Sequence, residues 1–400
     1  MTERTGVFPA TGDTAFVETL APFRVPRSAY IHVPFCRHRC GYCDFTLVAG
    51  RDDLIERYLS AMERELATLQ TPRSVDTLFL GGGTPTHLAP AQLERFLELL
   101  RTWFDLARDA EFSVEANPRD LLESDRVNVL ARLGVNRISL GVQSFDDTVL
   151  KRLERDHQAD EVERVVEHLS RLIPNVALDL IFGVPGQTLE SWRATLERAI
   201  ALRPAHVSTY GLTFEKGTTF WTRRSKGELS PAPEDLEYEM YALAMDRLPA
   251  AGYGHYELSN FARPGRDCRH NETYWAGRPC FAFGPGAARY IAGVREIGHR
   301  STTSWLAKVE AGESPVGYRE ELTAEDRARE ALIVGLRRTR GVSRDEFARD
   351  HGFNLDELGR SAWDRLCQRG LIEATEGGYR LTRAGRFLAD TVTVEFVGTT

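Results

Sequence analysis

Four hundred residues, of which 42% are hydrophobic and 27% charged, have the composition of an ordinary globular protein. The formal net charge of −7 argues against broad nucleic-acid binding, which needs a basic surface. Residues 1–20 carry three acidic residues and no apolar core of a signal peptide, and no stretch of about 18 uncharged apolar residues follows. Six cysteines, three of them within eight positions, are not typical of a secreted disulfide framework. These features predict a cytoplasmic protein without a membrane span.

Short β-rich runs alternate with helical stretches from residue 28 to about residue 210. The strands are expected at 29–34, 75–80, 111–115, 136–140, 175–181 and 206–210. Six βα units in a row predict a parallel sheet curled into a partial or full barrel, with the helices outside. Ligands bind such barrels at the carboxyl ends of the strands, and most of the chemically functional residues of this chain follow strands.

The first strand leads into a loop with the pattern C-x3-C-x2-C, formed by Cys36, Cys40 and Cys43. Three thiolates at this spacing can bind three irons of a [4Fe–4S] cluster, and the fourth iron can then chelate S-adenosylmethionine. A structural zinc site usually has four protein ligands, and only His32 and His38 lie near enough in sequence to supply a fourth. The cluster therefore fits the loop better than zinc does. The other cysteines, Cys268, Cys280 and Cys367, are expected to be buried apolar side chains.

Polar and glycine residues also follow the later strands. The run 81–85, Gly-Gly-Gly-Thr-Pro, comes after the second strand, and its backbone can approach a ligand closely. Glu115, Gln143, Arg155 and Asp179 supply acceptors for ribose hydroxyls and a donor for a carboxylate. Taken singly, Glu115 could cap a helix, Arg155 could form a surface ion pair and Asp179 an interior one. As a set on successive strand ends they favour ligand binding.

A second module is expected near residue 322, after a helix at 233–249 and a glycine-rich segment at 252–298 that would cover the barrel mouth. Helices at 323–337, 343–350 and 354–369 precede a β-hairpin, which is the winged-helix order. The recognition-helix position mixes acidic and basic residues, so a structural or substrate-covering role is favoured over DNA contact. No nucleic-acid partner is expected.

The cysteine loop resembles that of the radical S-adenosylmethionine superfamily, and the glycine run resembles its motif after the second strand. Together with segments 30–36, 115–118, 141–145 and 179–185, these motifs resemble the coproporphyrinogen III dehydrogenase-like group over about residues 28 to 390. That resemblance implies a radical-SAM (β/α)6-type partial barrel with a C-terminal winged-helix-like α+β module. The expected organisation is an N-terminal extension (1–27), the barrel (28–250), a barrel-closing extension (251–320) and the C-terminal domain (321–395).

Three features favour the HemW-type haem chaperones within this group over the oxygen-independent dehydrogenases. The dehydrogenases carry another cysteine two residues after the third ligand, where this chain has Phe45. They also have a longer N-terminal segment, whereas 29 residues precede Tyr30 here. Residues 270–275 read HNxxYW, a signature of the chaperone branch. Imidazole can ligate haem iron and aromatic rings can stack on a porphyrin, although His270 could instead cap the core beside packed aromatics.

The resemblance implies a site for each cofactor. The S-adenosylmethionine contacts would be Tyr30, Tyr42, Gly82, Gly83, Thr84, Glu115, Gln143, Arg155, Asp179 and Gly211. The haem contacts would be His270, Tyr274 and Trp275, and the cluster ligands the three loop cysteines. The partners would be haem, an acceptor protein and, for radical chemistry, an electron donor such as flavodoxin or ferredoxin. The alternatives are coproporphyrinogen III dehydrogenase and a haem-degrading radical methyltransferase, and productive cleavage of S-adenosylmethionine stays open.

Overall fold

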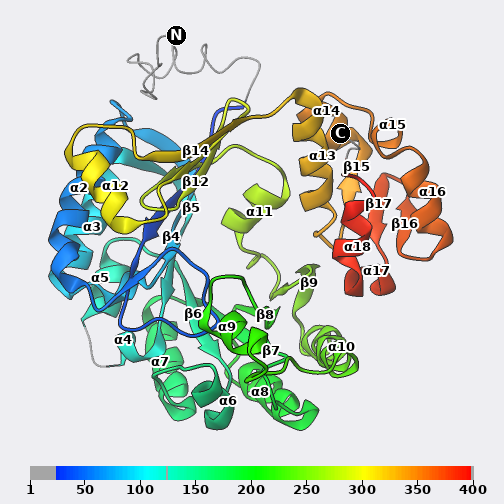
Figure 1. Cartoon of the computed structure of the whole chain (residues 1–400), viewed down its shortest axis with the longest axis horizontal. Coiled ribbons are helices and arrows are strands. Elements are labelled where there is room, and N and C mark those ends of the chain that lie inside the picture. The colour runs from blue at the N-terminus through cyan, green and yellow to red at the C-terminus, as the bar shows by residue number, and fades with distance from the viewer. Residues whose placement is uncertain (1–23, 123–124, 398–400) are drawn as a thin grey trace.

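The computed structural model describes residues 24–122 and 125–397, so most of the expected N-terminal extension lies outside the described residues. Six parallel strands form the wall of an open barrel in chain order (Figure 1). They are β1 (Ser28–Val33), β4 (Arg73–Gly82), β5 (Phe104–Ala116), β6 (Arg137–Gln143), β7 (Asn175–Phe182) and β8 (His206–Gly211). The predicted six-stranded partial barrel is confirmed, and every expected strand is present.

Three further strands extend the two edges of this sheet. β11 (Phe281–Phe283) pairs parallel to β1, while β10 (Asn260–Ala262) pairs antiparallel to β8 and carries β9 (Gly254–Glu257) on its outer side. The order is β11-β1-β4-β5-β6-β7-β8-β10-β9, so the described sheet is an arc whose two end strands do not pair with each other.

Helices cover the outer face of the sheet because each presents one apolar stripe to it. In α2 (Ile55–Ala67), for example, Leu59, Met62 and Leu66 are all buried. Burial of each such side chain contributes about 1.5–3 kcal/mol. The other outer helices are α3 (Pro90–Trp103), α4 (Pro118–Leu121), α5 (Arg126–Arg132), α6 (Asp147–Arg152), α7 (Ala159–Leu172), α8 (Leu189–Ala201) and α10 (Glu234–Ala250).

Short elements surround the carboxyl ends of the strands. They are β2 (Phe35–Cys36), β3 (Val48–Ala49), η1 (Asp52–Leu54), η2 (Pro85–His87) and α9 (Thr219–Ser225). A small antiparallel sheet and a helix follow β11 in the chain, namely β12 (Ala288–Ile291), β13 (Val294–Gly298), α12 (Thr302–Glu310) and β14 (Val316–Glu321). No helix within the described ranges is long and apolar enough to span a membrane.

The C-terminal module has its own apolar core, which includes Leu332, Trp363 and Leu366. Its helices are α13 (Ala324–Gly335), α14 (Arg344–His351), α15 (Leu355–Gly359), α16 (Ser361–Gln368), α17 (Arg383–Phe387) and α18 (Ala389–Val394). Its antiparallel sheet has the order β15 (Val342–Ser343), β17 (Gly378–Leu381), β16 (Ile372–Thr375). The predicted winged-helix-like arrangement is confirmed. The single helix predicted at 354–369 is wrong, because Arg360 adopts a φ of 41° and divides it into α15 and α16.

The segment expected to cover the barrel mouth instead places α11 (Arg269–Trp275) at the opposite end. This helix lies between the barrel strands and α13 (Figure 1). It contacts Thr77 of β4 and Glu111 of β5, which pair with each other level with Ser28, the first residue of β1, and so mark the amino end of the barrel. This helix is held there because the buried carboxylate of Glu111 binds its first backbone N–H groups, and closure of the barrel by the segment 251–320 stays a prediction.

Candidate cluster and S-adenosylmethionine site

The cysteine loop is closed by its own small ladder. β2 and β3 pair in parallel, with Cys36 opposite Ala49, so the loop begins and ends at one place. Within the loop the Cys43 N–H donates to the Cys40 carbonyl at 3.1 Å. The His32 ring lies 2.6 Å from the carbonyl oxygen of Thr46 through Nε2, which ties the end of the loop to β1. The backbone of the loop and the His32 side chain thus hold its two ends together.

The glycine turn after β4 packs directly against this loop. The Gly83 N–H donates to the Val33 carbonyl at 2.8 Å, and the Thr84 N–H donates to the Phe35 carbonyl at 2.7 Å. A Cβ on Gly83 would lie 2.7 Å from the Phe35 oxygen, and one on Gly82, at a φ of +108°, would lie 2.4 Å from the His32 ring. Both glycines are therefore required for the contact between β4 and β1, in addition to any contact with a ligand.

A cavity of about 520 Å³ opens at the carboxyl ends of the strands. All three loop cysteines line it, and so do nine of the ten residues predicted to contact S-adenosylmethionine. The nine are Tyr42, Gly82, Gly83, Thr84, Glu115, Gln143, Arg155, Asp179 and Gly211. Residues from six strand ends thus meet in one place, as the barrel prediction requires.

Tyr30 is the exception. Its ring stacks on Phe79 with centroids 6.1 Å apart, and its hydroxyl lies 3.1 Å from His32 Nδ1. Because His32 in turn contacts Thr46, Tyr30 reaches the cysteine loop only through that histidine. The predicted contact of Tyr30 with S-adenosylmethionine is not made at the cavity wall.

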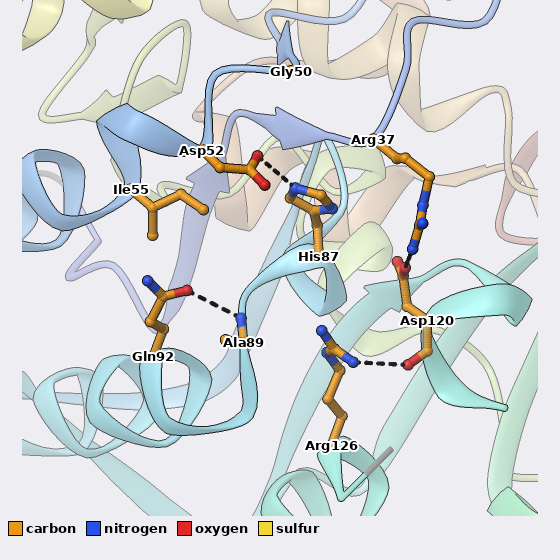
Figure 2. A pocket seen from close by; sticks show the side chains of 9 residues that line it. All are labelled: Arg37, Gly50, Asp52, Ile55, His87, Ala89, Gln92, Asp120 and Arg126. Carbon is orange, nitrogen blue, oxygen red and sulfur yellow. Dashed lines mark hydrogen bonds and ion pairs between the residues drawn. The ribbon is translucent and has the colours of Figure 1, made fainter. Parts of the chain in front are cut away.

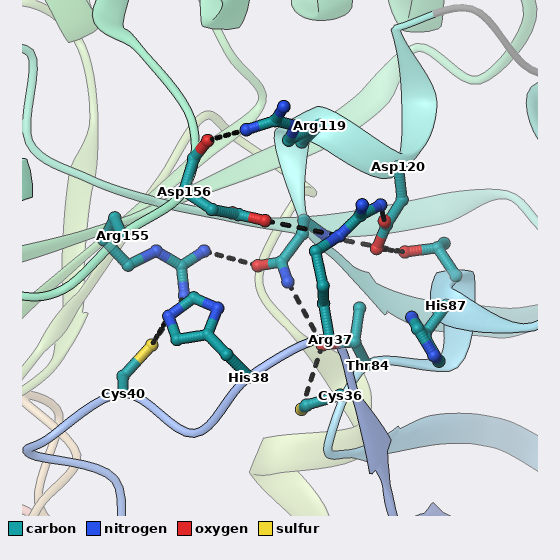
Figure 3. A network of polar contacts seen from close by, with 12 residues as sticks. Cys36, Arg37, His38, Cys40, Thr84, His87, Arg119, Asp120, Arg155 and Asp156 are labelled. Atoms are coloured by element: carbon teal, nitrogen blue, oxygen red, sulfur yellow. Dashed lines mark hydrogen bonds and ion pairs between the residues drawn. The ribbon is translucent and has the colours of Figure 1, made fainter. Parts of the chain in front are cut away.

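A polar network connects two of the cysteines across the cavity (Figure 3). The Thr84 hydroxyl lies 3.3 Å from Cys36 Sγ and accepts a bond from the Asn117 amide at 3.2 Å. The Asn117 oxygen accepts a bond from Arg155, whose other terminal nitrogen lies 3.6 Å from Cys40 Sγ. Arg155 also donates to the Gly141 carbonyl at 2.9 Å. The guanidinium is therefore held facing both the cysteine loop and the cavity.

Two carboxylates face the cavity with raised pKa values. Burial raises the pKa of Glu115 to about 7, although the Gly82 N–H donates to it at 2.9 Å and opposes the shift. Burial also raises the pKa of Asp179, which accepts a bond from Ser139 at 2.9 Å. Each carboxylate can accept further hydrogen bonds, and a ligand hydroxyl that donates to one would favour its ionised form.

Several buried polar atoms at this cavity have no hydrogen-bond partner among the described residues. They are Gln143 Oε1, Arg155 Nε and Asp179 Oδ1. Unpaired buried polar atoms are costly, so two free acceptors and one free donor in the same wall fit a polar ligand that has both kinds of group. S-adenosylmethionine has hydroxyl and amino donors together with a carboxylate acceptor.

The cysteines also fit an iron–sulfur cluster. Burial raises the pKa of Cys36 to about 12, so its thiol stays protonated until a strong positive charge binds nearby. Within 24–122 and 125–397, no group of three or more His, Cys, Asp or Glu side chains is arranged to hold a metal ion. In a cluster each thiolate binds a different iron, so the three sulfurs can be spread along a wall.

Among the polar lining residues that sequence reasoning missed are Asn117, Ser139, Tyr210 and Ser259. Ser139 is two residues before Gly141 on β6, and Tyr210 directly precedes Gly211 on β8. Strand alternation could have identified Ser139 as inward-facing. Ser259 had no signal, since its position depends on β10 folding back against β8.

A second cavity, of about 530 Å³, shares Arg37 with the first (Figure 2). Its charged groups are largely occupied by one another. His87 lies 2.8 Å from Asp52, and Arg37 lies 3.4 Å from Asp120. Because the two acidic and two arginine side chains balance, this cavity shows no preference for a charged ligand.

The residues predicted to contact haem lie elsewhere, on α11. His270 is 1% exposed, with Nδ1 2.9 Å from the Thr77 hydroxyl and Nε2 3.0 Å from the Tyr274 hydroxyl. Burial, and then the charge of Arg137, lower the pKa of His270 to about 3. Both ring nitrogens are therefore engaged, and ligation of iron by His270 would first require breaking one of these bonds.

The two motif aromatics flank this histidine. The Tyr274 ring packs edge-on against His270 with centroids 5.1 Å apart. Trp275 faces the C-terminal module, where the Arg337 guanidinium lies 4.8 Å from the centre of its indole. The geometry agrees with the alternative that His270 caps the core beside packed aromatics, and haem contact by these residues stays a prediction.

Comparison with known proteins places the chain in a family. The model described as "Radical SAM superfamily" matches residues 30–199, and "HemN C-terminal domain" matches residues 322–388. "Heme chaperone HemW" of Bacillus subtilis is 37% identical over 377 residues, covering 93% of this chain and 99% of the relative. The Escherichia coli protein of the same name is 40% identical over 268 residues, covering 66% of this chain and 69% of the relative.

A solved structure shares nearly the whole fold. Coproporphyrinogen III oxidase (HemN) from Escherichia coli, described as a radical SAM enzyme, superposes with a TM-score of 0.81 at 26% identity. The match covers 96% of this chain and 93% of the other. Because full-length identity is higher to the HemW proteins, and the cavity carries the cysteine loop and strand-end residues of the superfamily, the chain belongs to the HemW family of radical SAM proteins.

Proposed function

We propose that this chain is a haem chaperone, which binds haem and passes it to an acceptor protein while the barrel holds a cluster and S-adenosylmethionine. The observation that carries the proposal is the 37% identity to a protein named heme chaperone over 93% of this chain. That alignment includes both the barrel and the C-terminal module, so the likeness is not confined to the cofactor site. Its protein partners would be a haem acceptor and, for radical chemistry, an electron donor such as flavodoxin or ferredoxin.

Membership of the radical SAM superfamily implies a [4Fe–4S] cluster and S-adenosylmethionine. Cys36, Cys40 and Cys43 would ligate the cluster, and the nine cavity residues would hold S-adenosylmethionine. When bound, the cluster supplies an electron for reductive cleavage of the sulfonium. Arg155 would donate to the methionine carboxylate, Glu115 and Asp179 would accept from hydroxyl or amino groups, and Thr84 would orient Cys36.

The enzymatic alternative, coproporphyrinogen III dehydrogenation, is not favoured. The fold does not separate the two functions, since HemN shares it at a TM-score of 0.81. The site does differ at Phe45, where the resemblance expects a cysteine in the dehydrogenases. Phe45 is 53% exposed and lines the cavity, so an apolar ring stands where the enzymes would carry a thiol.

The test uses the full chain with an anaerobically reconstituted cluster. We expect haem titration to produce a saturable Soret band, and incubation with coproporphyrinogen III, S-adenosylmethionine, a chemical reductant and an electron acceptor to yield no protoporphyrinogen IX. Formation of protoporphyrinogen IX would contradict the chaperone assignment in favour of the enzyme. Absence of saturable haem binding would contradict it outright.

A further inference from the structure

The segment that follows α13 joins the C-terminal module to the hairpin of β9 and β10. The Leu258 N–H donates to the Arg337 carbonyl at 3.1 Å, and Glu257 forms an antiparallel bridge with Arg338. The first residues after α13 therefore pair with the end of β9 in the manner of a short strand. This pairing brings the Arg337 side chain to the turn of residues 257–260, called the β9–β10 turn below.

One carboxylate organises the β9–β10 turn. Glu257 is fully buried, and its Oε1 accepts the Ser259 N–H at 2.9 Å and the side-chain amide of Asn260. Its Oε2 accepts a bond from the Arg337 guanidinium at 3.2 Å, the one ion pair that Glu257 forms within the described ranges. Burial raises the pKa of Glu257, and the charge of Arg337 opposes that shift. Without this cation a buried carboxylate would be left unpaired, which is unfavourable.

The β9–β10 turn is also part of the cluster cavity. Ser259 lines the cavity, and its carbonyl accepts the Thr209 N–H of β8 at 2.7 Å. Asn260 pairs with Ser208, which in turn pairs with Asp179 of β7. The turn is therefore bound to Arg337 on one side and, on the other, to the strand beside a residue predicted to contact S-adenosylmethionine. A displacement of the turn would move the cavity wall.

The last residue of the HNxxYW motif contacts the same arginine. The Arg337 Cζ lies 4.8 Å from the centre of the Trp275 indole, within the range of a cation–π interaction. Trp275 ends α11 and is half-buried. Because an arginine side chain has many rotamers in solution, a ring on one side and a carboxylate on the other restrict it to one arrangement. The motif thus reaches the cavity wall through Arg337 and Glu257.

Resting on the assignment of S-adenosylmethionine to the cluster cavity, we propose that Arg337 is a positioning residue through which the C-terminal module and the HNxxYW motif complete this cofactor site. Trp275 orients the guanidinium, Glu257 pairs with it, and the β9–β10 turn then presents Ser259 to the cofactor. The C-terminal module acts on the cavity without lining it, since no described residue after Ser259 lines the cavity. The motif thereby gains a role that does not depend on contact with haem.

The experiment is a calorimetric titration of S-adenosylmethionine into the full-length chain with a reconstituted cluster. Arg337→Met removes the charge and keeps most of the side-chain length. Arg340→Met is the matched control, because Arg340 is 59% exposed and pairs with Glu272 and Glu346 instead. We expect Arg337→Met to bind S-adenosylmethionine at least fivefold more weakly at unchanged iron content, and the control to match the unmodified chain.

A rescue separates the proposed path from a general loss of packing. Glu257→Gln added to Arg337→Met keeps an oxygen that accepts the Ser259 N–H and leaves no buried charge, so the double variant should bind within twofold of the unmodified chain. Trp275→Leu should weaken binding in the same direction and Trp275→Phe should preserve it, because phenylalanine keeps an aromatic face. Trp275→Leu leaves the ion pair intact and provides the same comparison if Arg337→Met does not fold.

Hydrogen exchange of the backbone in the β9–β10 turn gives a measurement without the cofactor. We expect faster exchange there in Arg337→Met and a return to the original rate in the double variant. Folded Arg337→Met or Trp275→Leu protein that binds S-adenosylmethionine within twofold of the unmodified chain, or a double variant that binds no better than Arg337→Met, would overturn the inference while the cofactor assignment stands. If the unmodified chain binds no S-adenosylmethionine, the assignment and the inference fail together.

Discussion

Two glutamates on the same strand, Glu111 and Glu115, mark the two ends of the barrel. Glu111, at the amino end, accepts bonds from the N–H groups of Arg269 at 2.9 Å and His270 at 3.1 Å. Glu115, at the carboxyl end, accepts one from Gly82 and otherwise faces the cavity. The same residue type in the same strand face therefore anchors a helix at one end and offers a binding group at the other. The partners that the fold brings to each carboxylate decide which role it has.

The largest expected effect is loss of the cluster from the carboxyl end. Replacing Cys40 by alanine removes one of three ligands and should abolish cluster assembly. Cys268→Ala is the matched control, because this buried thiol lies 3.6 Å from Glu111 at the other end. Iron and sulfide analysis after reconstitution should show loss in the first variant and full content in the second. Equal cluster content in both would contradict the assignment of the loop.

The stability of the fold should depend far more on Glu111, at the amino end, than on Glu115. Glu111→Ala removes one of the carboxylates near the fully buried Arg137, leaving Asp179, and frees the first turn of α11, at a cost of about 3–5 kcal/mol. Glu115→Ala should change stability by about 1 kcal/mol or less, because it removes one hydrogen bond and one unfavourable buried carboxylate. Urea unfolding measures both. Similar losses of stability in the two variants would mean that Glu111 and Glu115 stabilise the fold equally.

His270, like Glu111 at the amino end of the barrel, should contribute to the stability of the fold. His270→Ala leaves the hydroxyls of Thr77 and Tyr274 without their partner, which should lower stability by about 2 kcal/mol. The Soret maximum of bound haem should not move, because both ring nitrogens of His270 are engaged by hydroxyl groups. A shifted or lost Soret band in folded His270→Ala protein would assign iron ligation to His270 after all.

Ligand affinity at the carboxyl end of the barrel should depend on pH. Because the pKa of Glu115 is raised to about 7, its ionised form dominates only above that pH. Affinity for S-adenosylmethionine should therefore fall about tenfold from pH 8 to pH 6, as the acceptor for ligand hydroxyls becomes protonated. The contribution of Glu115 to the stability of the ligand-free chain has the opposite sign, falling as pH rises from about 4.5 to about 7. Calorimetric titration should show both trends vanish in Glu115→Gln, and a persistent pH slope would implicate another group.

The residues that line the cluster cavity were predicted better from the sequence than the surroundings of the HNxxYW motif. Strand-end residues such as Gln143 and Asp179 were identified because loops after parallel strands converge on one face, a rule that needs only the order of the elements. Tyr30 does not line the cavity, because its side chain turns toward Phe79 and His32, and its contact with S-adenosylmethionine stays a prediction. The end of the barrel that α11 enters could not be predicted, because it depends on Glu111, which is far from α11 in sequence.

The sequence by itself determined the cysteine loop, the six βα units and the order of the C-terminal module, because spacing and hydrophobic periodicity are local properties of the chain. Only the tertiary structure decided that His270 is enclosed beside Thr77 and Tyr274, with both ring nitrogens engaged. The burial of a side chain and its hydrogen-bond partners depend on residues brought together across large sequence separations. The motif could therefore be read from the chain, whereas the surroundings that set the role of its histidine could not.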